Sequence, residues 1–343
     1  MRKLLALALV LGLAAAAAIA ETPSKGLPTN CVTYYKAGVT GHPGTLFTTG
    51  DGGIWFTEVR EDRIGRFDIG SKRAKEFQLP PMSGPRAIAR DPKDPNQIWF
   101  AGITDRIGHF DLRSGKTQFF MKGLTPGGVP HAIVVGSDGD VYWTEQQKPL
   151  FDYLDPRTGK VTELTKGPDG VTLHGLAADP DGQHLWATRQ DADQLIRFNI
   201  KTKSFDKTVQ LPKGAGPHSL ILGPDKHTLW IAFQHSSQLG SYDISTGQVK
   251  AFDTPLKAQN TPDPQPAPKI LDLEVGPGGK SIYFTTFFAN RLFRFDIAKQ
   301  KLSEPNCPIR PGGSSLGLVH GPDNKIWFSS ALSGEIDRVN DTR

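Results

Sequence analysis

Residues 130–133 read Pro-His-Ala-Ile, and residues 139–145, a few positions further on, read Gly-Asp-Val-Tyr-Trp-Thr-Glu. This stretch is the clearest copy of a unit that recurs along the whole chain. An aromatic residue marks the same place in every copy, and the seven are Trp55, Trp99, Tyr142, Trp186, Trp230, Tyr283 and Trp327. They are 43 or 44 residues apart, except for one interval of 53. Seven copies at a nearly constant period predict a repeat architecture.

Each copy consists of short β-type runs, which favours four-stranded propeller blades over helical repeats. The third copy shows these runs most clearly, at His131–Val135, Val141–Glu145, Leu150–Leu154 and Lys160–Leu164. Turns rich in Gly and Asp separate the runs, as tight hairpins require. The sequence therefore predicts an all-β fold, a single seven-bladed β-propeller domain of four-stranded blades over residues 21–343, with the repeated aromatic residues in its core.

The two ends of the chain complement each other. The last copy ends near Val339 without a fourth run, and an isolated strand-like segment stands at Cys31–Lys36. We expect this N-terminal strand to fill the gap and close the ring. Cys31 and Cys307 are the two cysteines, and Cys307 ends the fourth run of the sixth copy, next to the closing strand. In an exported protein they predict a disulfide, whereas a metal site would need more clustered ligands.

The N-terminus predicts export. Arg2 and Lys3 precede an apolar run, and Ala18-Ile19-Ala20 has the small residues of a signal-peptide cleavage site. We therefore expect residues 1–20 to be a signal peptide and the mature protein to be secreted or periplasmic, without a membrane anchor. Removing Arg2 and Lys3 lowers the formal net charge from +5 to +3. A charge this small indicates no nucleic-acid partner, and we expect a monomer.

The start of the first run in each copy predicts a functional site. Because the strands of a blade alternate in direction, this position and the loop between the second and third strands lie on one face, at the mouth of the central channel. In chain order the position holds Gly44, Arg86, His131, His174, His218, Leu271 and Leu316. Three adjacent blades thus present histidine beside an arginine. These imidazoles could transfer protons, bind a metal ion or, alternatively, plug the channel by hydrogen bonds to a neighbouring backbone.

The facing loops add polar and aromatic groups to the same rim. The candidate substrate-binding residues are Arg86, Arg189, His235, Phe287 and Phe288, and Asp191 is a candidate catalytic carboxylate. A Pro-rich insertion, Thr254–Pro268, belongs to this rim as well. The combination predicts a small-molecule or cyclic-peptide ligand held by its polar edge at the channel mouth. Glu58 and Glu145 end the second strands of their blades, and we expect them to be structural.

The repeats resemble those of a known family. Residues 53–58 read Gly-Ile-Trp-Phe-Thr-Glu, residues 63–67 read Arg-Ile-Gly-Arg-Phe, and residues 130–133 add the Pro-His-Ala-Ile motif. Over about residues 43–339 the chain resembles the virginiamycin B lyase (streptogramin lyase) family of seven-bladed propellers. The resemblance implies an enzyme that opens a cyclic depsipeptide antibiotic by elimination across its ester, with Mg²⁺ as cofactor. A base would remove the proton α to a carbonyl, and the metal would help to hold the developing negative charge.

The family pattern has histidine at the start of two neighbouring blades and glutamate two residues before the second histidine. His131 and His174 match the pair in order, and His218 offers a second pairing with His174. Thr172 and Gly216 stand at the glutamate position.

Three hypotheses follow. In the first, which the adjacent histidines favour, the protein is a metal-dependent carbon–oxygen lyase. His131, His174 and His218 then transfer protons or bind the metal, and Asp191 supplies the carboxylate. In the second, which the absent glutamates favour, it is a non-catalytic propeller that binds a ligand or a protein. In the third, it is a lactonase-like hydrolase.

Overall fold

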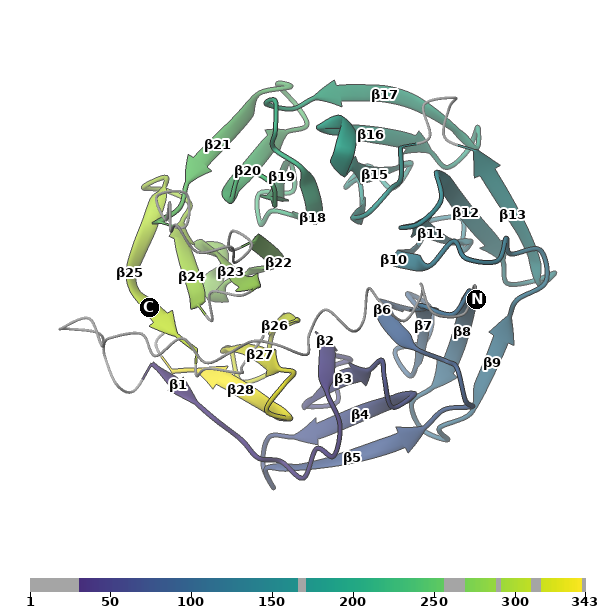
Figure 1. Cartoon of the computed structure of the whole chain (residues 1–343), viewed down its shortest axis with the longest axis vertical. Coiled ribbons are helices and arrows are strands. Elements are labelled where there is room, and N and C mark those ends of the chain that lie inside the picture. Colours follow the sequence, from purple (N-terminus) through teal and green to yellow (C-terminus); the bar gives the residue numbers. More distant parts are fainter. Residues whose placement is uncertain (1–30, 166–170, 256–268, 288–290, 310–315, 341–343) are drawn as a thin grey trace, which may run out of the picture.

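The computed structural model of the chain describes residues 31–165, 171–255, 269–287, 291–309 and 316–340. Figure 1 shows seven antiparallel sheets arranged as blades around a central channel. Each sheet has four strands, so the predicted seven-bladed propeller is confirmed. No helix in these ranges is long and apolar enough to cross a membrane. The predicted signal peptide and residues 256–268 of the insertion lie outside them.

Blades are numbered in chain order, with the innermost strand first. Blade 1 consists of β2 (Pro43–Phe47), β3 (Gly53–Glu58), β4 (Arg63–Asp68) and β5 (Arg73–Gln78). Blade 2 consists of β6 (Pro85–Arg90), β7 (Gln97–Gly102), β8 (Arg106–Asp111) and β9 (Thr117–Phe120). Blade 3 consists of β10 (Pro130–Val135), β11 (Val141–Glu145), β12 (Leu150–Asp155) and β13 (Lys160–Thr165). Blade 4 consists of β14 (Leu176–Ala178), β15 (His184–Arg189), β16 (Gln194–Asn199) and β17 (Ser204–Gln210).

The remaining blades repeat this plan. Blade 5 consists of β18 (Pro217–Leu222), β19 (Thr228–Phe233), β20 (Gln238–Asp243) and β21 (Val249–Asp253). Blade 6 consists of β22 (Lys269–Val275), β23 (Ser281–Phe287), β24 (Arg291–Asp296) and β25 (Lys301–Pro308). Blade 7 consists of β26 (Leu318–His320), β27 (Ile326–Ser330), β28 (Glu335–Val339) and β1 (Val32–Thr33). Short 3₁₀ turns, η1 (Gln190–Ala192) and η3 (Pro277–Gly279), occur in blades 4 and 6.

The second strand of each blade contributes most of the core residues, because the neighbouring blades cover both of its faces. Every residue of β3 and β11 is buried, whereas the outermost strand β17 alternates between exposed and half-buried residues. None of the seven repeated aromatic residues is more than 4% exposed, which confirms their predicted place in the core.

Glycine in the third strand makes room for the aromatic ring beside it. A Cβ at this position would lie 2.1–2.3 Å from a ring carbon of the phenylalanine on the second strand. The three pairs are Gly65 with Phe56, Gly108 with Phe100, and Gly240 with Phe233. The repeat therefore needs glycine here for close packing, and its backbone conformation is ordinary extended strand.

The predicted closure of the ring is confirmed. Strand β1 pairs antiparallel with β28, with Val32 opposite Val339 and Thr33 opposite Arg338. The Asn340 amide donates to the Cys31 carbonyl at 2.9 Å. The N-terminus thus supplies the fourth strand of blade 7 (Figure 1), although the strand is shorter than the predicted Cys31–Lys36 segment.

The predicted disulfide stays a prediction. Cys31 is buried in an apolar cluster that includes Leu292 and Val339. Leu292 is the ladder partner of Cys307 in the β24–β25 pair. The two cysteines therefore belong to adjoining parts of blades 6 and 7, but the Cys307 side chain lies outside the described part of the structure.

Candidate functional site

A β-bulge places the first and third histidines at the channel mouth. In blade 3, Pro130 pairs with Glu145 and Ile133 with Trp143, so His131 and Ala132 together face Thr144. Blade 5 has the same shift, with His218 and Ser219 between two paired positions. A bulge bends the strand and redirects a side chain. The Pro-His motif therefore turns each imidazole toward the channel before the regular strand begins.

Threonine side chains tie the histidine backbones to the preceding blade. The Thr144 hydroxyl accepts from the Ala132 amide at 3.1 Å and donates to the His174 carbonyl at 2.5 Å. In blade 4 the Thr188 hydroxyl accepts from the Gly175 amide and donates to the His218 carbonyl, both at 2.7 Å. Blades 3 and 4 thus each position the histidine of the next blade.

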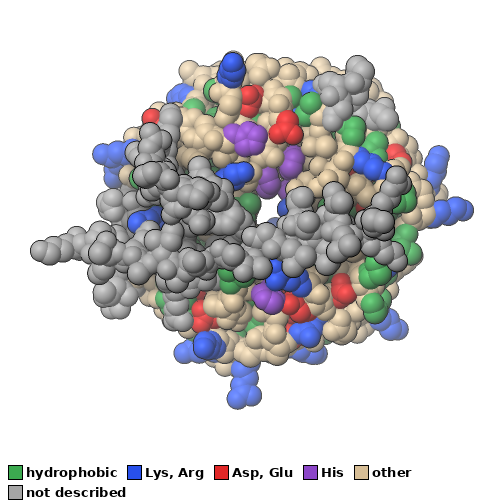
Figure 2. All heavy atoms as spheres, viewed as in Figure 1, with side chains coloured by type: hydrophobic (Ala, Val, Ile, Leu, Met, Phe, Trp, Pro, Cys, Tyr) green, Lys and Arg blue, Asp and Glu red, His purple; other side chains and the backbone are tan. Residues whose placement is uncertain are grey.

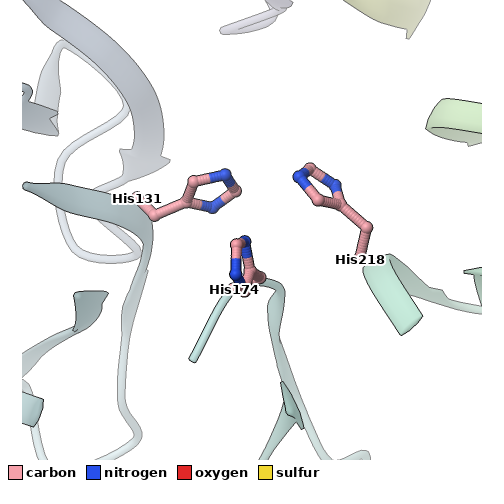
Figure 3. A group of neighbouring side chains, drawn as sticks. All are labelled: His131, His174 and His218. Atoms are coloured by element: carbon pink, nitrogen blue, oxygen red, sulfur yellow. The ribbon is translucent and has the colours of Figure 1, made fainter. Parts of the chain in front are cut away.

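The three imidazoles converge in the channel (Figure 3). The ring centroids of His131 and His174 are 5.1 Å apart, those of His131 and His218 also 5.1 Å, and those of His174 and His218 5.3 Å. One ring nitrogen from each lies within 4.8 Å of the other two. All three side chains are at least nine-tenths buried. We name this group the histidine triad.

Arg86, on the inner strand of blade 2, completes the cluster. Its Nη2 donates to Nε2 of His131 at 2.9 Å, and its Nη1 donates to Oε1 of Gln146 at 2.7 Å. Among the described residues no carboxylate pairs with this guanidinium, and burial lowers the pKa of Arg86 to about 10. At neutral pH the site therefore holds a half-buried cation that has no counter-ion among the described residues.

Burial and the neighbouring guanidinium keep the triad neutral. Both effects lower the pKa of His174 to about 4, and Asp191 opposes them in part. Burial, followed by Arg86 and the other two imidazoles, holds the pKa of His131 well below its usual range. The pKa of His218 is likewise lowered by burial, then by His174 and Arg86. At pH 7 all three rings are neutral and Arg86 is charged.

Three further charged or ionisable groups at the rim shift the pKa values of the triad. Asp191, in η1, is exposed and raises the pKa of His174. His235 is also exposed, lies against Gly216 and lowers the pKa of both His174 and His218. Lys269, at the start of β22, lowers the pKa of His218. Figure 2 shows the central hollow with histidine and basic side chains beside it.

Other candidates lie elsewhere. Arg189 is buried and donates to Oε1 of Gln194 at 2.6 Å, within its own hairpin. Glu58 and Glu145 are buried inside their blades, where Glu145 accepts from the Trp143 indole at 2.9 Å. The Phe287 side chain and Phe288 lie outside the described part of the structure.

Sequence reasoning missed Gln146 and Lys269. Gln146 directly follows Glu145 in a second-to-third loop, so the same loop argument that selected Asp191 and His235 could have found it. Lys269 stands two residues before the start position of blade 6, immediately after the insertion. Nine extra residues lengthen this interval of the repeat, so the position of Lys269 in the ring could not be predicted from the period.

The histidine triad does not suit Mg²⁺. This ion prefers carboxylate, carbonyl and water oxygens in octahedral geometry. Here the clustered donors among the described residues are three imidazoles, and Asp191 lies outside the group of atoms within mutual ligand distance. The Arg86 guanidinium also occupies Nε2 of His131. The donor set and the nearby positive charge both disfavour a hard dication.

Fold and site together define a seven-bladed β-propeller whose channel mouth combines neutral imidazoles with a half-buried guanidinium. The virginiamycin B lyase family matches residues 9–203, more than half of the chain, and a second family of seven-bladed propellers, the lactonases, matches residues 154–306. The chain belongs to the virginiamycin B lyase family.

Several solved structures share the fold. A streptogramin B lyase is 22% identical, with a TM-score of 0.76 over 90% of this chain and 97% of that one. The virginiamycin B lyase from Staphylococcus aureus is 19% identical, with a TM-score of 0.74 over 90% and 98%. A catalytically inactive histidine-to-alanine variant of that enzyme, with quinupristin, is 18% identical, with a TM-score of 0.76 over 90% and 98%. No curated protein is similar in sequence.

Proposed function

We propose that this protein is a carbon–oxygen lyase that opens a cyclic ester by elimination at the channel mouth. The observation that carries the proposal is the convergence of three neutral imidazoles and one half-buried guanidinium from four successive blades. Membership of the virginiamycin B lyase family supports the reaction class. The related enzyme that becomes inactive when a histidine is replaced by alanine supports histidine as the reactive group.

In this reaction His174 is the general base. Its ring is neutral at pH 7, its buried Nδ1 has no hydrogen-bond partner among the described residues, and Asp191 increases its basicity. His131 is less suited to the role, because its Nε2 lone pair already accepts a hydrogen bond from Arg86. A positioned base of this kind contributes roughly 10²- to 10⁴-fold in rate.

Arg86 stabilises the negative charge of the reaction. His174 takes the proton α to the carbonyl, the C–O bond breaks as a C=C bond forms, and the ester oxygen leaves with the electron pair as a carboxylate. The proton then passes from His174 to solvent. A fixed guanidinium in a water-poor site stabilises developing negative charge strongly, and no step in this scheme is routed through a metal ion.

The test is incubation of the purified mature protein with a streptogramin B antibiotic, with Mg²⁺ or with EDTA, followed by mass spectrometry. Elimination leaves the mass unchanged, and fragmentation reveals a linear product with one new C=C bond. His174→Ala should abolish opening, whereas His227→Ala, which changes a half-exposed histidine in the β18–β19 turn, should not. An intact ring with the wild-type protein, under both conditions, argues against the proposal.

Hydrolysis of a lactone is the second candidate, because the lactonase family matches residues 154–306. Here a neutral histidine would activate water instead of removing a carbon-bound proton. The product would gain the mass of one water and contain no new C=C bond. The same mass-spectrometric experiment, repeated with simple lactones, separates the two reactions.

A further inference from the structure

We propose that Arg86 and the histidine triad form a binding site for a free carboxylate, with the guanidinium in the electrostatic role that the family resemblance gives to Mg²⁺. The ligand class is a peptide or small organic acid that bears the carboxylate. The inference rests on the proposed function in one respect, since ring opening releases this group. The binding itself can be measured without any reaction.

The first argument is the unpaired charge. Arg86 is half-buried, and taking a cation partly out of water costs free energy unless an anion or a set of hydrogen-bond acceptors compensates it. Arg86 has two acceptors, Gln146 and His131, and no carboxylate among the described residues. A guanidinium has five N–H donors in a planar fork. The two hydrogen bonds fix the fork and leave donors for a bidentate carboxylate.

The second argument is the unsatisfied imidazole nitrogens. His131 accepts from Arg86 through Nε2, so its ring proton is on Nδ1. The buried Nδ1 atoms of His131 and His218 have no hydrogen-bond partner among the described residues. A neutral imidazole always offers one N–H donor, and a buried donor without an acceptor is expensive. A carboxylate in the triad would provide acceptors for these rings and for Arg86 at once.

The third argument is the balance of charge at the mouth. Arg86 lowers the pKa of all three imidazoles, and Lys269 lowers the pKa of His218. Against these two cations stands Asp191, which raises the pKa of His174 and is exposed at the rim. The local potential therefore favours an anion over a divalent cation.

The experiment is an NMR titration of protein labelled with ¹⁵N in histidine. Sodium acetate is compared with acetamide at constant ionic strength, which is maintained with sodium chloride. Acetate should shift the ring signals of His131, His174 and His218 saturably in the millimolar range, and acetamide should not. Arg86→Gln should remove the response. Arg113→Gln, which alters an exposed arginine paired with Asp94 in the β8–β9 turn, should retain it.

A conservative variant guards against misfolding. If Arg86→Gln does not fold, Arg86→Lys keeps the charge but loses the fork, and it should weaken acetate binding about tenfold. Unchanged acetate binding in either variant overturns the proposal, as does saturable binding of MgCl₂ at the triad without any response to acetate. Acetate binding without ring opening contradicts the proposed function alone, and ring opening without acetate binding contradicts this inference alone.

Discussion

At the residue scale, the chemistry of the site follows from one contact. Arg86 donates to His131 and lowers the pKa of all three imidazoles. Without this charge the triad would titrate closer to neutrality, as ordinary histidines do. Burial and the guanidinium therefore fix the protonation state of the bases together, and the guanidinium also provides the positive charge that the proposed reaction needs.

The first prediction is the pH dependence of ring opening. The base must be neutral, so kcat/KM should rise as the pH passes about 4, the pKa to which His174 is lowered. Arg86 must be charged, so kcat/KM should fall as the pH passes about 10. The profile should be flat between these limits. An acidic limb near pH 6.5 would show that the base is an unperturbed histidine.

The second prediction concerns a buried carboxyl pair in blade 3. Glu145 and Asp152 are almost fully buried, and burial, followed for Asp152 by repulsion from Glu145, raises the pKa of both. The folded protein therefore holds protons that the unfolded chain releases above the usual carboxyl pKa. Stability contributed by these protons is present at low pH and is lost as the pH rises through the raised pKa values.

Replacing Asp152 by Asn should remove this loss. We expect the variant to be more stable than the wild type at pH 8 by roughly 1–2 kcal/mol, with a smaller difference at pH 5. Denaturant unfolding at the two pH values measures it. Asp206→Asn is the contrasting control, because Arg197 lowers the pKa of Asp206 and its removal should not stabilise the protein at pH 8. Equal stability of Asp152→Asn and wild type at both pH values would contradict the prediction.

At the element scale, the bulge and the threonine bridge position the histidines. In blades 3 and 4 a threonine hydroxyl on the second strand accepts a hydrogen bond from a backbone amide of the same blade. The same hydroxyl donates to the backbone carbonyl of the histidine in the next blade. Rotation of one blade would therefore move the imidazole of its neighbour. Blade 7 has a hydroxyl at the equivalent place, since Ser329 accepts from the Leu316 amide at 3.3 Å, but the start position of the next blade is Gly44, which is not a site residue.

The third prediction uses this repetition. Thr144→Val keeps the shape of the side chain and removes both hydrogen bonds, which should cost about 1–3 kcal/mol of stability. Ring opening should slow about tenfold or more, because the His174 backbone loses its fixed position. Ser329→Ala, which removes the equivalent hydroxyl in blade 7, should leave the rate within about twofold. Equal rates for the two variants would mean that the bridge has no role in positioning.

At the scale of the whole molecule, the ring is held by contacts between successive blades. Seven separate apolar clusters form among the described residues, one at each interface. The interface between blades 6 and 7 also includes Cys31 and Val339, so the two ends of the chain meet there. Closing the ring removes the last free blade edge.

The fourth prediction is that Cys31 and Cys307 form a disulfide across this closure. Thiol titration of the denatured, non-reduced protein should find no free thiol. Cys31→Ser should lower the free energy of unfolding by about 4–5 kcal/mol, as the chain-entropy model gives for a long loop. A protein that already shows two free thiols, and whose stability is insensitive to reductant, would falsify the pairing.

Much of the fold could be predicted because its signals are local and repeated. The position of Trp55 and its six equivalents gave the number of blades, and the missing fourth run after Val339 gave the closing strand. The alternating direction of the strands placed Arg86 and the three histidines on one face. The contact between Arg86 and His131, and the separation of Asp191 from the triad, could not be read from spacing, because both depend on side-chain orientation.

The sequence by itself determined the architecture of this protein, its closure and the residue types at the channel mouth. A periodic pattern of apolar residues and turns can be recognised from residues that are close together in the sequence. The tertiary structure alone decided the distances within the triad, its neutral state and the absence of a carboxylate partner for Arg86 among the described residues. Those properties arise from burial and from contacts between residues 45 positions apart, such as Arg86 and His131, which meet only when the blades curve into a ring.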